Sequence, residues 1–263
     1  MRNKPNDELI FGVQLKCDIN DWDFCALDLS VNEQIAVVRE IYSKMGFLTE
    51  FKIDNDIFIT FLWRCQYYYS RHNNPFHNFL HGVTVCHAAY YFLNNVPQLG
   101  EIQNHQKLGF LTACLGHDLD HRGKNNAYEV SSTSRLAIRY FDNSPLENHH
   151  AATLFKILNY DDSRIFLDVA DDQMAEIKKN MIENILATDM KHHMSIVADF
   201  KKKVIQGETT SRHHLSSHHR QFHRSHELLY SLRRPLWQCQ EVRRGHPVVA
   251  VGEQRVLQPG TIF

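Results

Sequence analysis

Two short stretches of the chain concentrate side chains that bind metals. His77 and His81 lie four residues apart in FHNFLHG, and His117 and His121 lie four apart in GHDLDHRG. Residues four apart share one face of a helix, so each pair can point into one cleft. Asp118 directly follows His117, and its two oxygens could bridge two ions. Imidazole and carboxylate suit Zn²⁺, and carboxylate with water suits Mg²⁺ or Mn²⁺, so we expect one site for two metals.

The chemistry that fits such a site is hydrolysis of a phosphoester. Two ions about 4 Å apart would hold an attacking hydroxide and a phosphoryl oxygen together. Single histidines elsewhere are expected to be structural: His72, His87, His105 and His192. Residues 117–121 differ, because two histidines and two aspartates after the apolar run LGFLTACLG are unfavourable to bury without a metal or a hydrogen-bond network. By spacing alone, Gly123, Asn125 and Asn126 favour a polar turn and a helix cap.

The elements that position these residues are predicted to be helices. Ser30 with Glu33 three residues later is a capping-box pattern, and Gly46 ends the helix that follows. Further helices are expected at 54–69, 79–94, 104–116, 145–158, 171–188 and 191–205. Strand-like alternation is not sustained anywhere. The pattern therefore predicts a single all-α domain with short loops.

Composition limits the classes of function. A chain of 263 residues that is 43% hydrophobic can bury a sizeable core, and its formal net charge of -1 argues against a nucleic-acid partner. No stretch approaches the roughly 18 apolar residues that a membrane span needs. Six cysteines occur without CxxC pairs, which favours reduced thiols and a cytoplasmic location.

The C-terminal segment differs from everything before it. Residues 209–263 contain eight Arg, three Glu and no Lys or Asp, a net charge of +5, whereas 1–208 carry -6. We therefore expect a lead-in at 1–30, a helical domain at 31–207 and an unrelated His- and Arg-rich tail, disordered by composition, at 208–263. Histidine pairs spaced by four occur there, and such tracts usually bind metals adventitiously: His214 and His218, His219 and His223.

Four blocks of the sequence resemble the signature blocks of one enzyme family and occur in the same order along the chain. FHNFLHG, HDLDHRGKNN, LENHHAATLFKIL and ILATDMKHHM are similar to the signature blocks of the class I 3',5'-cyclic nucleotide phosphodiesterase catalytic domain, a branch of the HD-type metal phosphohydrolases. The resemblance covers roughly residues 10–207. It implies a compact multi-helix domain, incomplete at its C-terminus, that hydrolyses cAMP or cGMP to the 5'-nucleoside monophosphate in signal transduction.

The resemblance also implies roles for individual residues. His81, His117 and Asp118 would be metal ligands, with Asp118 bridging a tightly held Zn²⁺ and a looser Mg²⁺ or Mn²⁺. His77 would be the general acid, since the 3' alkoxide is a poor leaving group until it is protonated. His121 would hydrogen-bond the attacking hydroxide and the phosphate.

Further positions match the surroundings of the family's metals and substrate. Glu147 and Thr188 match residues that bind waters on the second metal, although a helix-start acid and a helix cap explain them equally well from sequence. Asn78, Asp189 and Met190 match residues that border the substrate pocket. A cyclic nucleotide is the implied partner, and a homodimer is an open question.

Two departures from the family pattern stand out. Phe76 occupies the position of a common tyrosine and lacks its hydroxyl. The second departure is the absence of the block that carries a second aspartate ligand, and of the glutamine and aromatic clamp that grip the base. Residues 209–263 contain no aspartate, so three protein ligands plus water would hold the first metal. The glutamines there lie in no recognisable context: Gln221, Gln238, Gln240, Gln254 and Gln258.

Three hypotheses remain open from the sequence. The chain hydrolyses cyclic nucleotides, or it is a catalytically impaired truncated form that acts as a binding or regulatory module, or it is an HD-type phosphohydrolase of linear nucleotides. Preference for cAMP or cGMP is not readable, because the residues that would orient the family's glutamine are absent.

Overall fold

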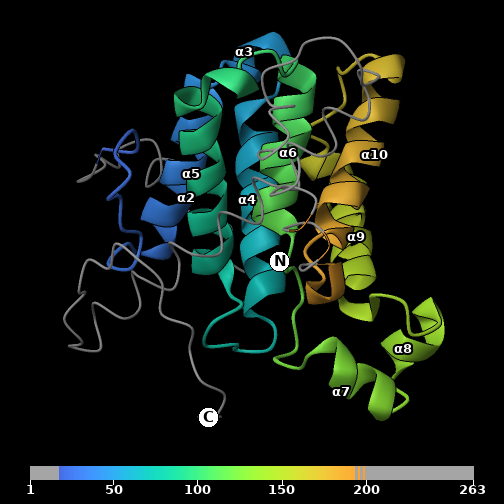
Figure 1. The fold of residues 1–263 in the computed structure, drawn as a ribbon. Helices are drawn as coiled ribbons and strands as arrows, with labels where there is room; N and C mark the ends of the chain where they lie inside the picture. The colour runs from blue at the N-terminus through green and yellow to red at the C-terminus, as the bar shows by residue number, and fades with distance from the viewer. Residues whose placement is uncertain (1–17, 193–194, 196–197, 199–263) are drawn as a thin grey trace.

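The computed structural model describes residues 18–192, 195 and 198. Over these residues it is built from helices, and no strand is found among them (Figure 1). The longer helices are α2 (Val31–Lys44), α4 (Asn55–Ser70), α5 (Phe79–Asn95), α6 (Asn104–Gly116), α9 (Pro145–Leu158) and α10 (Asp171–Leu186). The short ones are α3 (Phe47–Glu50), α7 (Asn126–Ser131), α8 (Arg135–Tyr140) and the 3₁₀ turns η1 (Pro97–Leu99), η2 (Asp161–Ser163) and η3 (Met190–His192). The predicted all-α class is confirmed.

Side-chain caps define where the main helices begin. At α2, the Ser30 side chain accepts from the backbone N–H of Glu33 while the Glu33 carboxylate accepts from the N–H of Ser30, which is the predicted capping box. Asp54 caps α4 and Asn78 caps α5 through a side-chain oxygen that accepts from backbone N–H groups of the first turn. Gly46 follows α2 with φ of 75°, a left-handed conformation that glycine adopts without strain.

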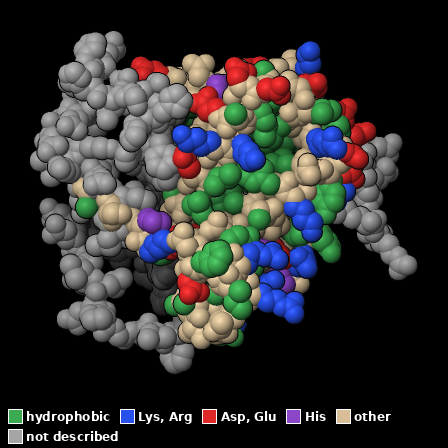
Figure 2. Space-filling view, turned by 90° about the vertical axis from the view of Figure 1, so that its right-hand side faces the viewer, with side chains coloured by type: hydrophobic (Ala, Val, Ile, Leu, Met, Phe, Trp, Pro, Cys, Tyr) green, Lys and Arg blue, Asp and Glu red, His purple; other side chains and the backbone are tan. Residues whose placement is uncertain are grey.

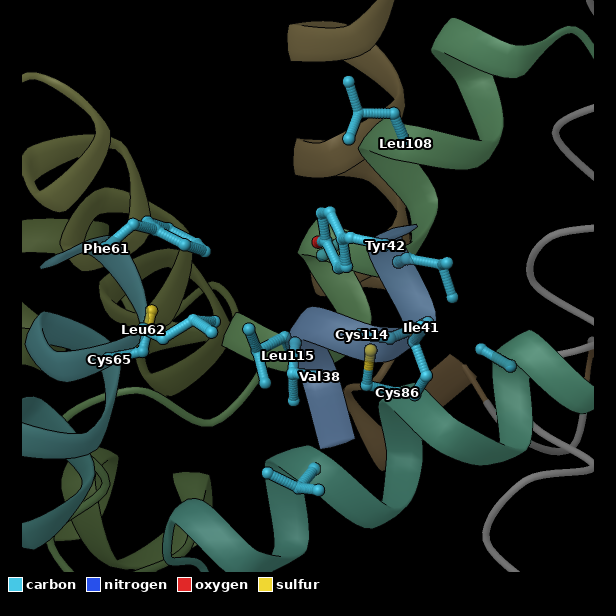
Figure 3. Packing of buried hydrophobic residues seen from close by; sticks show 14 of the residues in the cluster. Val38, Ile41, Tyr42, Phe61, Leu62, Cys65, Cys86, Leu108, Cys114 and Leu115 are labelled. Carbon is cyan, nitrogen blue, oxygen red and sulfur yellow. The ribbon is translucent and has the colours of Figure 1, made fainter. Parts of the chain in front are cut away.

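Helix α6 forms the centre of the core. It lies between α5 and α10 and contacts both, and Leu108, Leu111 and Leu115 on it are fully buried. Figure 3 shows side chains of α2, α4 and α5 converging on it, among them Tyr42 and Leu62. A helix surrounded by others must be apolar on nearly all sides, which explains the run LGFLTACLG.

The described part of the N-terminal lead-in packs on α5. The side chains of Ile19 and Phe24 are buried, and the ring of His87 contacts both the Ile19 carbonyl and the Phe24 ring. Burial lowers the pKa of His87. The tail at 208–263 lies outside the described residues, as do its histidine pairs spaced by four.

The surface carries both charged and apolar side chains. Figure 2 shows hydrophobic side chains at the surface between Lys, Arg, Asp and Glu, on the side that Figure 1 shows at its right. The most exposed large apolar residue among those described is Phe141, 89% exposed. No helix in residues 18–192 combines the length and the apolar character needed to cross a bilayer.

Candidate metal centre

The two histidine stretches meet because α5 and α6 run in opposite directions side by side (Figure 1). His81 lies in the first turn of α5, and His117 is the residue that ends α6. The start of one helix therefore adjoins the end of the other. Gly82 makes this close approach possible, since a Cβ at this position would lie only 2.8 Å from the Leu115 carbonyl oxygen of α6.

Three ligand atoms converge at this junction. The Nε2 atoms of His81 and His117 lie 3.2 Å apart, and Asp118 Oδ2 lies 3.2 Å from the first and 3.1 Å from the second. Ligands bound at 2.0–2.1 Å in a tetrahedron lie about 3.3 Å from one another. The spacing of these three atoms therefore fits one Zn²⁺, and within residues 18–192 they form a group that could hold a metal ion.

Hydrogen bonds prepare His117 as a ligand. Its Nδ1 lies 2.8 Å from the Cys114 carbonyl oxygen, to which it can only donate, so Nε2 is the nitrogen available to a metal. Burial alone would raise the pKa of Asp118, but the charges and hydrogen bonds of His117 and His81 hold it well below its ordinary value. The carboxylate is therefore ionised at neutral pH and available to a cation.

A second group lies on the other oxygen of Asp118. His150 Nε2 is 3.8 Å from Oδ1, while its Nδ1 donates to the Leu119 carbonyl oxygen at 2.7 Å. Burial lowers the pKa of His150 to about 3, so Nε2 is an unprotonated acceptor facing a carboxylate. Two acceptors in that position require a cation or a water between them. Asp118, His121 and His150 form the second group that could hold a metal.

Hydrogen bonds to Nδ1 hold the ring of His121 in place. Its Nδ1 receives hydrogen bonds from the Asn74 side-chain amide at 3.1 Å and from the backbone N–H of Gly123 at 3.0 Å. Burial lowers the pKa of His121 to about 4, an effect that Asp118 opposes and His77 reinforces. The neutral ring then has its proton on Nε2, the nitrogen left to face the site.

His77 lies directly over His121. The two rings stack with centroids 4.0 Å apart and planes 18° from parallel, and the His77 ring also contacts Phe76 and His81. Phe76 packs on His81 as well, with centroids 5.0 Å apart. The ring of Phe76, which has no hydroxyl, therefore packs against His77 and His81.

Asp120, the second aspartate of HDLDH, does not face this group. It is 3% exposed and its carboxylate bonds to Arg71 at 2.9 Å, His72 at 3.0 Å and His149 at 2.8 Å. Burial would raise the pKa of Asp120, but His149 and then Arg71 and His72 lower it. A hydrogen-bond network therefore stabilises Asp120, whereas Asp118 belongs to a group that could hold a metal ion.

Glu147 lies close enough to Asp118 for the charge of that carboxylate to affect its pKa. It is buried, and Asn126 donates to its Oε2 at 2.8 Å and accepts from the Leu146 N–H. Burial raises the pKa of Glu147, and the charges of Asp189 and Asp118 add to the rise. Asn126 therefore does more than continue a polar turn, because it joins the start of α7 to the start of α9.

The other predicted pocket residues have protein partners or are exposed. Asn78 accepts from the His81 N–H and donates to two carbonyl groups of the preceding turn. Asp189 is buried and accepts from the Ser144 hydroxyl at 2.8 Å, Thr188 donates to the Ile185 carbonyl, and Met190 is 56% exposed. Their contact with a substrate stays a prediction.

Comparison with known proteins identifies the fold and the family. The pattern of the 3'5'-cyclic nucleotide phosphodiesterase family, PDEase_I, matches residues 76–232, more than half of the chain. The chain belongs to this family. The match includes every histidine of the site and extends past the boundary expected at residue 207, so the division into domain and tail stays a prediction.

Individual relatives agree with the family assignment. The chain is 35% identical over 185 residues to the human "High affinity cGMP-specific 3',5'-cyclic phosphodiesterase 9A", covering 70% of this chain and 31% of that protein. It is 33% identical over 199 residues to the rat "3',5'-cyclic-AMP phosphodiesterase 4C", covering 74% and 37%. The phosphodiesterase domain of the RhoPDE fusion protein from the choanoflagellate Salpingoeca rosetta superposes with a TM-score of 0.76 at 30% identity, over 82% of this chain and 67% of that one. The chain thus spans about a third of the length of these curated relatives.

Three residues of the candidate site were not singled out from the sequence. His150 stands in the quoted block LENHH, and its four-residue distance from Leu146 on an apolar helix face was the available signal. Asn74 lies three residues before His77, from which Pro75 and Phe76 separate it. Tyr69, buried in α4, donates to the Leu115 carbonyl and accepts from the Asp118 N–H, a contact between distant segments that spacing does not reveal.

Proposed function

We propose that this site hydrolyses the cyclic phosphodiester of cAMP or cGMP to the 5'-nucleoside monophosphate, with divalent metals. The observation that supports it most is the position of Asp118, whose two oxygens face two different groups. Oδ2 faces His81 and His117 at 3.1–3.2 Å, and Oδ1 faces His150 at 3.8 Å. A carboxylate between two such groups is suited to bridge two ions.

The residues fit a tight Zn²⁺ at the first group and a looser Mg²⁺ or Mn²⁺ at the other oxygen of Asp118. His81, His117 and Asp118 would hold the zinc, while Asp118 would reach the second ion together with waters held by Glu147 and Thr188. When bound, two such ions lower the pKa of water and polarise a phosphoryl oxygen. The described group has three ligands, which leaves a coordination position free for water.

The protein's own side chains supply proton transfer and orientation. His77 is the proposed general acid, which protonates the 3' oxygen as its bond to phosphorus breaks. His121 is the proposed hydrogen-bond donor to the phosphate, through Nε2–H. Asn78, Asp189 and Met190 are proposed to border the pocket that receives the nucleotide. The relatives' names include both cGMP-specific and cAMP enzymes at 35% and 33% identity, so both nucleotides belong in the assay.

One observation supports a second candidate function, that of a catalytically impaired binding or regulatory module. Residues 209–263 contain no aspartate, and the first group among the described residues has three protein ligands. Such a module would bind cyclic nucleotide or metal without turnover.

A cytoplasmic location, a homodimer and the lack of a nucleic-acid partner remain proposals, of which the first is supported by four free cysteines among the described residues.

The deciding experiment measures release of 5'-AMP and 5'-GMP from cAMP and cGMP by the full chain, with zinc and Mn²⁺ or Mg²⁺. Turnover by the wild type that Asp118→Asn reduces to background supports hydrolysis, and Asp168→Asn is the control, because Asp168 is an exposed aspartate. Folded wild-type protein that binds cyclic nucleotide without turnover would support the module instead. Phosphate release from linear monophosphates, without action on cyclic ones, would indicate a linear-nucleotide phosphohydrolase.

A further inference from the structure

Asn74 lies in the turn between α4 and α5 and is buried. Its Oδ1 accepts hydrogen bonds from the backbone N–H groups of Phe76 and His77, both at 3.1 Å. A backbone N–H can only donate, so the atom that faces these two groups must be the carbonyl oxygen of the amide. The orientation of the Asn74 side chain is therefore determined by the backbone of the histidine block itself.

The other end of the same amide faces His121. With Oδ1 assigned, the atom 3.1 Å from His121 Nδ1 is the amide nitrogen, which can only donate. The backbone N–H of Gly123 donates to the same Nδ1 at 3.0 Å. Two independent donors on Nδ1 require that it accept, so the neutral imidazole of His121 carries its proton on Nε2.

We infer that Asn74 is a positioning residue that controls both histidines of the stack. One side chain holds the backbone of His77 through Oδ1 and fixes the tautomer of His121 through Nδ2. The statement about the tautomer rests on contacts alone, whereas its consequence for turnover rests on the proposed function, in which His121 donates from Nε2 to the phosphate. Residue spacing predicted no role for Asn74, since it lies outside both four-residue histidine pairs.

Replacement by aspartate reverses one of these contacts and keeps the other. In Asn74→Asp, a carboxylate oxygen still accepts from the N–H groups of Phe76 and His77. The second oxygen replaces a donor with an acceptor opposite His121 Nδ1. Gly123 still donates to this nitrogen in the variant. If Asn74 rather than Gly123 sets the tautomer, Nδ1 carries a proton in Asn74→Asp, and His121 becomes either the Nδ1–H tautomer, which has no Nε2 donor, or an imidazolium stacked on His77.

The neighbouring residue provides a matched control. Asn73 is exposed and has φ of 47°, a left-handed conformation that aspartate tolerates about as well as asparagine. Asn73→Asp introduces the same negative charge one residue away. Effects of charge or of a less stable turn will appear in both variants, whereas an effect on the His121 tautomer is expected only in Asn74→Asp.

The tautomer is read from long-range ¹H–¹⁵N correlation spectra of the zinc-loaded chain 1–263 with ¹⁵N-labelled histidine, with the His121 signals assigned by their loss in His121→Asn. The expected result is Nε2–H in the wild type and in Asn73→Asp, and a protonated Nδ1 in Asn74→Asp. A protonated Nδ1 in the wild type would overturn the inference whether or not any variant folds. So would an unchanged Nε2–H signal in folded Asn74→Asp.

Kinetics test the consequence for the proposed reaction. If the wild type hydrolyses cyclic nucleotide, Asn74→Asp is expected to lower kcat by about 100-fold, with KM changed by less than about 3-fold and Asn73→Asp unaffected. A shifted tautomer with unchanged kcat would overturn the positioning role. If the wild type shows no turnover, the proposed function fails while the tautomer result still decides whether Asn74 sets the proton on His121.

Discussion

The imidazole rings of His77 and His121 stack nearly in parallel, with centroids 4.0 Å apart. Two positive charges at this distance repel each other, so the stack favours at most one imidazolium. Burial, assisted by the charge of His77, lowers the pKa of His121 to about 4, so His121 stays neutral near pH 7. His121 is therefore the neutral ring of this pair, and Asn74 orients it.

The first prediction concerns the proton that His77 would deliver. His77→Gln removes the general acid but leaves the metal ligands, so kcat for cyclic nucleotide should fall by about 100-fold or more. A phosphodiester with p-nitrophenolate as the leaving group does not need protonation, and its hydrolysis should fall far less. Equal losses in parallel assays of the two substrates would contradict the role of His77 as an acid.

Acid should destabilise the chain through its buried neutral histidines. The pKa of His150 is about 3 in the folded state and 6.5 when unmodified by the fold. Between these values the unfolded chain binds more protons, so the free energy of unfolding falls as the pH drops below 6.5. From about pH 7 to about pH 5.5 one such histidine accounts for about 1 kcal/mol.

His150→Asn tests this dependence. Asparagine can still donate to the Leu119 carbonyl, as His150 Nδ1 does, but it does not titrate. Urea unfolding of metal-free protein at the two pH values should show a pH dependence smaller by about 1 kcal/mol in the variant. An identical dependence in both proteins would mean that His150 is not the neutral, buried group described.

Asp120 should contribute far more to stability than an exposed aspartate with an ion pair. Asp120→Asn weakens bonds to Arg71, His72 and His149 around a carboxylate that is 3% exposed, with an expected loss of about 2–3 kcal/mol. Asp162→Asn removes a surface ion pair with Arg64, with an expected loss below about 1 kcal/mol. Chemical denaturation of both variants gives the comparison, and similar losses would refute the special position of Asp120.

The turn before α9 stores backbone strain at Phe141. This residue has φ of 51° and is 89% exposed, so its ring gains little from burial while its Cβ is unfavourable in the left-handed region. Phe141→Asn should raise the free energy of unfolding by about 1 kcal/mol. Phe141→Ala, which removes the ring but keeps the Cβ penalty, should not. A thermal midpoint for Phe141→Asn at or below that of Phe141→Ala would count against the strain.

Local signals predicted most of the fold. The helices at 104–116 and 145–158 have the predicted bounds, because capping, proline and glycine signals mark their ends. The helix expected to reach Thr188 ends at Leu186, and the helix expected at 191–205 lies almost wholly outside the described residues. Short helices α3, α7 and α8 were not expected, since four to six residues are too few to show a helical period.

Residues of the candidate site that follow a helical spacing could be predicted from the sequence. Residues that are brought together only by tertiary contacts could not. His77, His81, His117, Asp118 and His121 come from two compact stretches, and the packing of α5 on α6 brings them together. Asn74, Tyr69 and the partners of Asp120 act through contacts between segments 29 to 49 residues apart. Neither periodicity nor residue type reveals such contacts.

The central claim is that the two histidine stretches form one zinc site, and zinc content tests it most directly. The full chain is dialysed and its zinc counted by mass spectrometry, for the wild type, for His81→Asn with His117→Asn, and for His214→Asn with His218→Asn as a matched pair in the tail. The account predicts zinc that remains bound in the wild type and the tail variant and is lost from the first variant. Zinc that is lost with the tail histidines and retained without His81 and His117 would contradict it.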